Sequence, residues 1–198
     1  MALLNLAESE ARWPNDGHRS HLCSIFRRDS DRFSTVVPFL LEGLRKNSKC
    51  VYFSDRLDKA DLFDWLMDAS PLAKEELEVR IGFLSADEVY LKNGKFDKDR
   101  MLGYLARSQE EALKAGYTGL TATGETSWAT RCESGDSDLI EYEAQVNLMY
   151  PGLSADLLCQ YSESDFDAAT LANALRAHPK VFVRGAVCSN PYYLPPET

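Results

Sequence analysis

Residues 116–128, GYTGLTATGETSW, constrain the fold more than any other stretch of the chain. The stretch opens with Gly116 after a long amphipathic pattern, and glycine is a common residue just past the end of a helix. Residues 120–123 are mainly small or β-branched, as a strand buried between two layers of helices requires. In open α/β sheets, ligands bind beyond the carboxyl ends of such strands, where Glu125 and Trp128 follow here. The stretch therefore predicts a central strand that ends at a candidate binding site.

Strand-like and helix-like segments alternate along the rest of the chain. Predicted strands, rich in β-branched and apolar residues, cover 21–26, 49–54, 79–84, 120–123, 156–161 and 180–187. Predicted helices, with apolar residues at helical spacing, cover 33–44, 58–69, 97–115, 137–150 and 165–177. Such alternation indicates an α/β fold, a three-layer sandwich in which helices cover both faces of a mainly parallel sheet. No composition shift divides the chain, so we predict a polar N-terminal arm, 1–17, and a single domain, 18–198.

Charge and cysteine content exclude several classes of protein. The formal net charge of −9 argues against direct contact with nucleic acid, because phosphate binding needs clustered lysine and arginine. No apolar run reaches the roughly 18 residues of a membrane span. No basic region precedes the short apolar run at the N-terminus, so we expect a cytoplasmic protein. The five cysteines are odd in number and contain no Cys-x-x-Cys pair, which disfavours disulfide frameworks and zinc fingers.

The motifs of common enzymes and metal sites are absent from the sequence. The loop after the first predicted strand, residues 26–30, contains no glycine, so its backbone cannot easily wrap a triphosphate. No Gly-x-Ser-x-Gly turn suggests a hydrolase. No His-x-x-x-His pair suggests a metal site, and although His21, Cys23 and Cys159 can meet across strands, we predict none. We therefore expect no enzyme activity, no catalytic residue and no cofactor.

Glu125 and Trp128 each allow a structural and a functional interpretation. Glutamate can cap the next turn and tryptophan can fill the core. Alternatively, both can line a pocket with Phe26, Ser54 and Tyr161, which end neighbouring predicted strands. A few polar groups in a mostly apolar cleft suit a small, weakly polar ligand. We adopt the pocket as the prediction, in which Glu125 orients the ligand or holds the loop that closes over it.

Glu143 lies near the edge of the apolar stripe of its predicted helix. It follows Leu139 by one turn and precedes Val146 by three residues. A carboxylate at such a position must find a donor, or its pKa rises. It either pairs structurally with an arginine or a backbone amide, or contacts a ligand, and we include it among the candidate ligand-binding residues.

Several segments together resemble one family. They are HLC at 21–23, PFLLEGL at 38–44, CVY at 50–52, GETSW at 124–128, Glu143 with Asn147, LCQY at 158–161, HP at 178–179 and NPYYLPP at 190–196. In this order and spacing they resemble the MEDS family, the sensory domain of methanogens and methylotrophs, over nearly the whole chain. One departure is Thr121, which stands where the family has an arginine, so the role of that arginine is not carried over.

The resemblance implies a RecA-like fold, related to clock-type ATPases, without their phosphate loop. It implies a cytoplasmic input domain of transcription regulators and sensor kinases that detects small hydrocarbon derivatives, and it adds His21 to the candidate ligand-binding residues. Because we identify no DNA-binding or kinase segment, we expect the signal to pass to a regulator or sensor-kinase partner, with a homodimer as an open alternative. The competing interpretation is a protein–protein interaction module, built on a degenerate ATPase fold without a ligand of its own.

Overall fold

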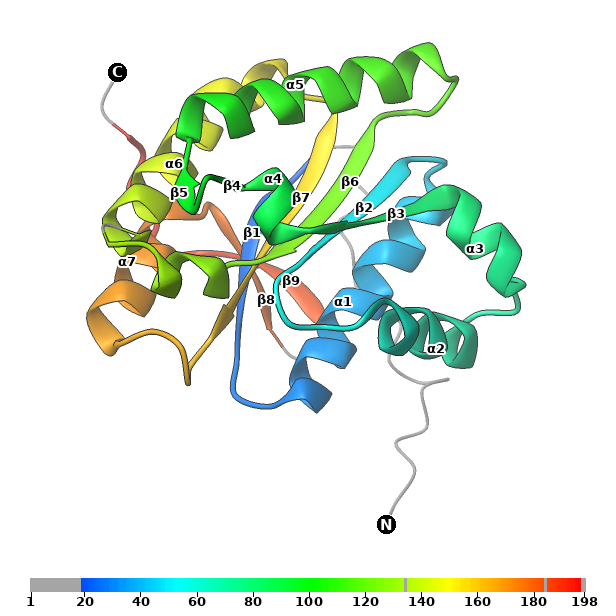
Figure 1. The fold of residues 1–198 in the computed structure, drawn as a ribbon, viewed down its shortest axis with the longest axis horizontal. Helices are drawn as coiled ribbons and strands as arrows, with labels where there is room; N and C mark the ends of the chain where they lie inside the picture. Colours follow the sequence, from blue (N-terminus) through cyan, green and yellow to red (C-terminus); the bar gives the residue numbers. More distant parts are fainter. Residues whose placement is uncertain (1–18, 134, 184, 197–198) are drawn as a thin grey trace.

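The computed structural model of the chain describes residues 19–133, 135–183 and 185–196. Seven strands in it form a mainly parallel sheet (Figure 1). Their order across the sheet is β3-β2-β6-β7-β1-β8-β9, and the pair β8–β9 is antiparallel. The strands are β1 (His21–Phe26), β2 (Lys49–Ser54), β3 (Ile81–Ser85), β6 (Leu120–Glu125), β7 (Ala155–Ser162), β8 (Lys180–Val183) and β9 (Ala186–Ser189). The predicted arm, 1–17, lies outside the described residues.

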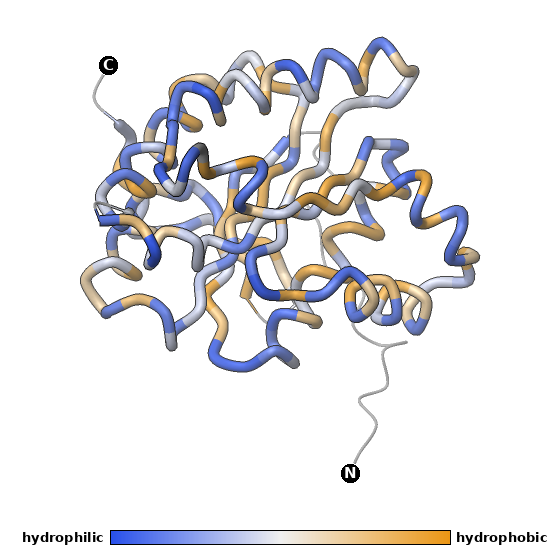
Figure 2. Tube along the Cα trace, in the orientation of Figure 1, coloured by the Kyte–Doolittle hydropathy of each residue, from blue (hydrophilic) through white to orange (hydrophobic). Residues whose placement is uncertain are grey.

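Helices cover both faces of this sheet. One face carries α1 (Asp29–Arg45), α2 (Lys59–Ala69) and α3 (Lys74–Arg80). The other carries α4 (Ala86–Val89), the hairpin β4 (Leu91–Lys92) with β5 (Lys95–Phe96), α5 (Lys98–Lys114), α6 (Gly135–Met149) and α7 (Ala168–Ala177). Figure 2 shows hydrophobic residues concentrated in the central strands and alternating with hydrophilic ones along the helices. The predicted three-layer α/β sandwich is confirmed.

Alternation along the strands sends neighbouring side chains to different cores. On β1, Leu22 packs in the core under α1 and α2, whereas Cys23 packs in the core under α6 and α7. On β6, the predicted central strand, which lies between β2 and β7, Ala122 packs on the α6 side, whereas Glu125 contacts Arg32 of α1. Neighbouring side chains of one strand therefore face different layers of helices.

Gly43 lets α1 approach β6 closely. A Cβ added at this position would lie 2.7 Å from Thr121, against the carbons and the hydroxyl of that side chain. Thr121 is 1% exposed, so it has little room to withdraw.

We expect Gly43→Ala to destabilise the protein, by about 1–3 kcal/mol for the overpacked contact less the helix propensity gained. Gly103→Ala on α5 is the matched control, because its added Cβ meets only the flexible end of Arg107, 3.1 Å away. That control should be neutral or more stable by up to about 1 kcal/mol. Urea denaturation of both variants checks the prediction, and equal effects at the two glycines would contradict it.

Two predicted strands differ from the structure. Residues 79–84 divide between the end of α3 and β3, with Val79 on an exposed helical face. Residues 180–187 form the β8–β9 hairpin, because Gly185 adopts a φ of 79° and turns the chain. Among the described residues, no helix has both the length and the apolarity to cross a bilayer.

Candidate functional site

Glu125, at the carboxyl end of β6, is 2% exposed, and donors surround its carboxylate. It accepts hydrogen bonds from the hydroxyl of Tyr52 (2.7 Å), the guanidinium of Arg32 (3.3 Å) and the backbone N–H groups of Asp55 (3.2 Å), Arg56 (2.7 Å) and Leu57 (3.2 Å). The hydroxyl of Ser54 donates to the Leu57 carbonyl in the same loop. Glu125 and Ser54 therefore hold the connection between β2 and α2, and this geometry favours the loop-holding role of Glu125.

Trp128 follows β6 in a short 3₁₀ segment (Ser127–Arg131) and is 0% exposed. Its ring stacks on Tyr90 at a centroid distance of 4.9 Å and lies 4.5 Å from the ring of Phe96. Its indole nitrogen has no hydrogen-bond partner among the described residues. This environment is an aromatic core beneath the β4–β5 hairpin, and it favours the structural interpretation of Trp128.

A second polar group lies on the α6–α7 face of the sheet. His21 Nε2 is 3.1 Å from Oε2 of Glu143, and the hydroxyl of Tyr161 donates to Oε1 of Glu143 at 3.0 Å. Cys159 Sγ is 3.4 Å and His178 Nε2 is 3.5 Å from the same Oε2 atom. The structure thus brings three of the predicted residues, His21, Glu143 and Tyr161, to one buried carboxylate.

Local hydrogen bonds fix both imidazole rings. His178 Nδ1 donates to the Ala174 carbonyl at 2.7 Å. His21 Nδ1 lies 2.8 Å from Oδ1 of Asn147, whose amide nitrogen donates to the Ala177 carbonyl at 2.5 Å. Because this amide nitrogen faces a carbonyl, Oδ1 faces His21 and accepts from it. Both rings therefore carry a proton on Nδ1 and present Nε2 to Glu143.

Burial and neighbouring charges set the protonation states of this group. Burial alone would raise the pKa of Glu143, but His178 and His21 outweigh it and lower that pKa well below the ordinary value. Burial, with His178 beside it, lowers the pKa of His21. Burial would also lower the pKa of His178, but Cys23 and Glu143 raise it well above the ordinary value. Burial raises the pKa of the Cys159 thiol. The ionised form of Glu143 and the neutral form of His21 are therefore favoured.

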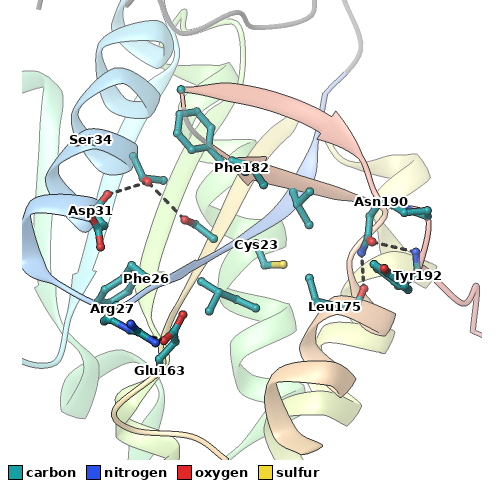
Figure 3. A pocket seen from close by; sticks show the side chains of 17 residues that line it. Cys23, Phe26, Arg27, Asp31, Ser34, Glu163, Leu175, Phe182, Asn190 and Tyr192 are labelled. Atoms are coloured by element: carbon teal, nitrogen blue, oxygen red, sulfur yellow. Dashed lines mark hydrogen bonds and ion pairs between the residues drawn. The ribbon is translucent and has the colours of Figure 1, made fainter. Parts of the chain in front are cut away.

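A cleft with a volume of about 570 Å³ lies beside the carboxyl half of β1 (Figure 3). It opens because β1 and β8 pair only at Leu22 and Cys23, and the two strands separate beyond that point. Its walls come from β1, the first turns of α1, the end of α7, the β8–β9 hairpin and residues 190–192. Phe26, Leu175 and Phe182 contribute apolar surface, and the ion pair of Arg27 with Glu163 (2.9 Å) lies at one end.

The cleft and the buried polar group adjoin each other. Cys23 lines the cleft and also acts on the charge of His178. Asn190, on the opposite wall, donates from its amide to the His178 carbonyl at 2.7 Å. Cys23 and Asn190 therefore connect the cleft with the end of α7, where His178 lies.

The seven predicted binding residues fall into separate places. Phe26 lines the cleft, while Glu125 and Ser54 hold the β2–α2 loop and Trp128 fills an aromatic core. The polar group includes two residues that the sequence analysis does not select for a binding role, Cys159 and His178. The signal for Cys159 is the strand register, since Cys159 lies opposite Cys23 on β1, the strand that begins with His21. The binding roles themselves remain predictions.

Solved structures similar to this one share its fold at low identity. A KaiC-like protein, PH0186, from Pyrococcus horikoshii OT3 matches with a TM-score of 0.53 and 14% identity, over 82% of this chain and 69% of that chain. The flagellar accessory protein FlaH from Methanocaldococcus jannaschii matches with a TM-score of 0.55 and 11% identity, over 87% of this chain and 78% of that chain. At these identities the likeness concerns the fold alone, which is RecA-like. The fold and the glycine-free loop after β1 define the chain as a RecA-like α/β domain without a glycine-rich phosphate loop.

The chain belongs to the MEDS family, described as the "MEthanogen/methylotroph, DcmR Sensory domain", whose family model matches residues 20–179. The transcriptional repressor DcmR from Methylorubrum extorquens (strain DSM 6343 / CIP 106787 / DM4) is 25% identical over 185 residues, which cover 90% of this chain. The matched part spans 65% of the length of that repressor. These matches indicate a sensory or regulatory role.

Proposed function

We propose that the chain is a cytoplasmic sensory domain that binds a small, weakly polar, hydrocarbon-derived ligand and passes the signal to a partner protein. The observation that carries the proposal is the cleft of about 570 Å³ beside β1. Its volume lies within the range of roughly 300–1,000 Å³ that is typical of small-molecule sites. Apolar walls with a few polar groups suit a ligand of this chemistry.

The α1 terminus beside the cleft favours a weakly polar ligand over a phosphate. Asp29 and Asp31 occupy the first turn of α1, where negative side chains repel an anion that would otherwise favour the helix N-terminus. Arg28, the cationic residue before the helix, pairs with Asp31 at 3.0 Å. The proposal accordingly assigns the chain no nucleotide and no catalytic step, as the sequence analysis predicts.

The β8–β9 hairpin is the element through which ligand binding would be signalled. It forms one wall of the cleft and is joined to β1 by pairing at only two positions. A ligand that bridges β1 and the hairpin would fix their separation and present an altered edge of the sheet to a partner. The name of the relative DcmR, a transcriptional repressor, supports a regulator as that partner.

Thermal denaturation with a panel of dichloromethane, methanol and short-chain alcohols tests ligand binding. A ligand that binds the folded state raises the melting temperature with concentration. We expect Val183→Trp, at the 49% exposed end of β8 in the cleft, to abolish the rise by filling the cleft. Val79→Trp, at a 72% exposed position on α3, is the matched control and should keep it.

The test also separates the competing function. A panel that leaves the melting temperature unchanged, together with a stabilising effect of a partner protein alone, would favour the interaction module. A rise that persists in Val183→Trp would place the ligand outside the cleft and would reject the proposed site.

A further inference from the structure

Four side chains with atoms that bind transition metals converge on the α6–α7 face of the sheet. His21 comes from β1, Glu143 from α6, Cys159 from β7 and His178 from the end of α7. One ligand atom of each lies within 4.8 Å of the other three. We propose that these four side chains bind one divalent transition-metal ion of the zinc type. This inference goes beyond the sensory function, because the proposed ion binds without any ligand in the cleft.

The distances between the ligand atoms suit a tetrahedral site. Bonds of about 2.0–2.3 Å from zinc to nitrogen, oxygen and sulfur place tetrahedral neighbours about 3.3–3.6 Å apart. Glu143 Oε2 lies 3.1 Å from His21 Nε2, 3.4 Å from Cys159 Sγ and 3.5 Å from His178 Nε2. Cys159 Sγ lies 3.7 Å from His21 Nε2. Only a small contraction of the side chains is therefore needed to enclose an ion.

The outer hydrogen bonds of both histidines are those of metal ligands. A metal-binding imidazole usually donates its other N–H to a carbonyl or carboxylate, which fixes the ring and directs the free nitrogen to the metal. His178 does so through the Ala174 carbonyl, and His21 through the Asn147 amide oxygen. The two Nε2 atoms that remain point into the group, and the buried His178 Nε2, 3.5 Å from Glu143, makes no hydrogen bond of ordinary geometry among the described residues.

A cation would also satisfy ring nitrogens that local hydrogen bonds leave directed into the group. Nδ1 of His21 faces the Asn147 amide oxygen, which leaves its Nε2 3.1 Å from the Glu143 carboxylate. Binding of the ion would release the Cys159 thiol proton, and any proton on the two Nε2 atoms, to solvent. The Glu143 carboxylate and the resulting thiolate would then balance the two charges of the ion. The side chains of His21, Glu143 and His178 are 0–1% exposed, so such a balance avoids an unpaired buried charge.

The ligand set and its surroundings indicate the class of metal. Imidazole and thiolate ligands suit zinc and other late first-row ions, whereas Mg²⁺ and Ca²⁺ prefer oxygen ligands. A cavity of about 20 Å³ adjoins His21, Glu143 and Cys159. That volume can hold about one water molecule. The cavity thus provides room for the ion to enter or for one exchangeable ligand.

Cobalt titration of chelator-treated protein tests the proposal. We expect one equivalent of Co²⁺ to produce visible d–d bands of a tetrahedral site and a sulfur-to-cobalt charge-transfer band. Cys159→Ser should remove the charge-transfer band. It should also weaken the affinity for Co²⁺ by at least roughly 10–100-fold, because that is the cost of losing a hydrogen-bond partner of a ligand, and Cys159 is a ligand itself. Cys188→Ser, which changes an exposed cysteine in β9, is the matched control and should leave both signals unchanged.

A measurement on the unmodified protein keeps the test independent of folding of the variant. Zinc-edge X-ray absorption of the Zn²⁺-loaded protein should report one sulfur and three nitrogen or oxygen ligands, and Zn²⁺ but not Mg²⁺ should raise the melting temperature. Failure to bind Zn²⁺ or Co²⁺, a zinc site without sulfur, or an unchanged charge-transfer band in folded Cys159→Ser would overturn the proposal. None of these outcomes involves the organic ligand, so failure of the metal site is distinguishable from failure of the sensory proposal.

Discussion

Replacing Trp128 with alanine is expected to lower the free energy of unfolding by about 3–5 kcal/mol, the usual cost of truncating a large buried aromatic residue. The indole is 0% exposed and packs against Tyr90 and Phe96, so its loss leaves a cavity that these rings fill only in part. The cleft beside β1 does not include Trp128, so binding of a cleft ligand should persist. Urea denaturation and ligand titration of the same variant measure the two effects.

Trp65→Ala is the matched control for this prediction. Trp65 lies partly exposed on α2, with an edge-to-face contact to Phe33 at 5.5 Å, so the same truncation should cost clearly less. A Trp128→Ala variant with nearly unchanged stability and lost ligand binding would contradict the core interpretation. It would instead establish Trp128 as the pocket wall that the sequence analysis predicts.

Local patterns predict most of the fold because each regular element carries its own signal. β1, β2 and α5 follow the predicted segments closely, since apolar alternation and helical spacing both reflect burial against the sheet. The pattern misses α3, whose sequence KEELEVR is mostly charged and buries only Leu77. It also misses the β8–β9 turn, which depends on the positive φ of one residue, Gly185. Helices with little buried surface and single-residue turns leave only a weak trace in periodicity.

The polar group shows why a site is harder to predict than a fold. Its four side chains with metal-binding atoms lie at positions 21, 143, 159 and 178, so no short motif connects them. What assembles them is the pairing of β1 with β7, which aligns Cys23 with Cys159, and the packing of α6 and α7 on that face. Burial of Glu143 near an apolar stripe can be predicted from its helix. Its partners, two histidines and not an arginine or a backbone amide, depend on that tertiary arrangement.

Glu125→Gln is expected to destabilise the protein by about 3–5 kcal/mol, as is typical when one partner of a buried ion pair is removed. The substitution keeps the shape of the side chain but removes the charge opposite Arg32, whose own side chain is 8% exposed. It also replaces one carboxylate oxygen with an N–H₂ donor. The N–H groups of Asp55, Arg56 and Leu57 all donate to this carboxylate, so at least one acceptor is lost and the β2–α2 loop loosens.

Glu110→Gln is the control, because Glu110 and Lys114 form an exposed pair on α5 at 3.6 Å. Exposed pairs contribute about 0–1 kcal/mol, so that variant should unfold almost as the unmodified protein does. Amide hydrogen exchange provides a local measurement, in which faster exchange at residues 55–57 in Glu125→Gln would locate the loss in the loop. Unchanged stability together with weaker ligand binding would contradict the structural role and would support Glu125 as a ligand-binding residue. The reason is that a buried carboxylate surrounded by donors cannot lose its charge without leaving those donors poorly paired.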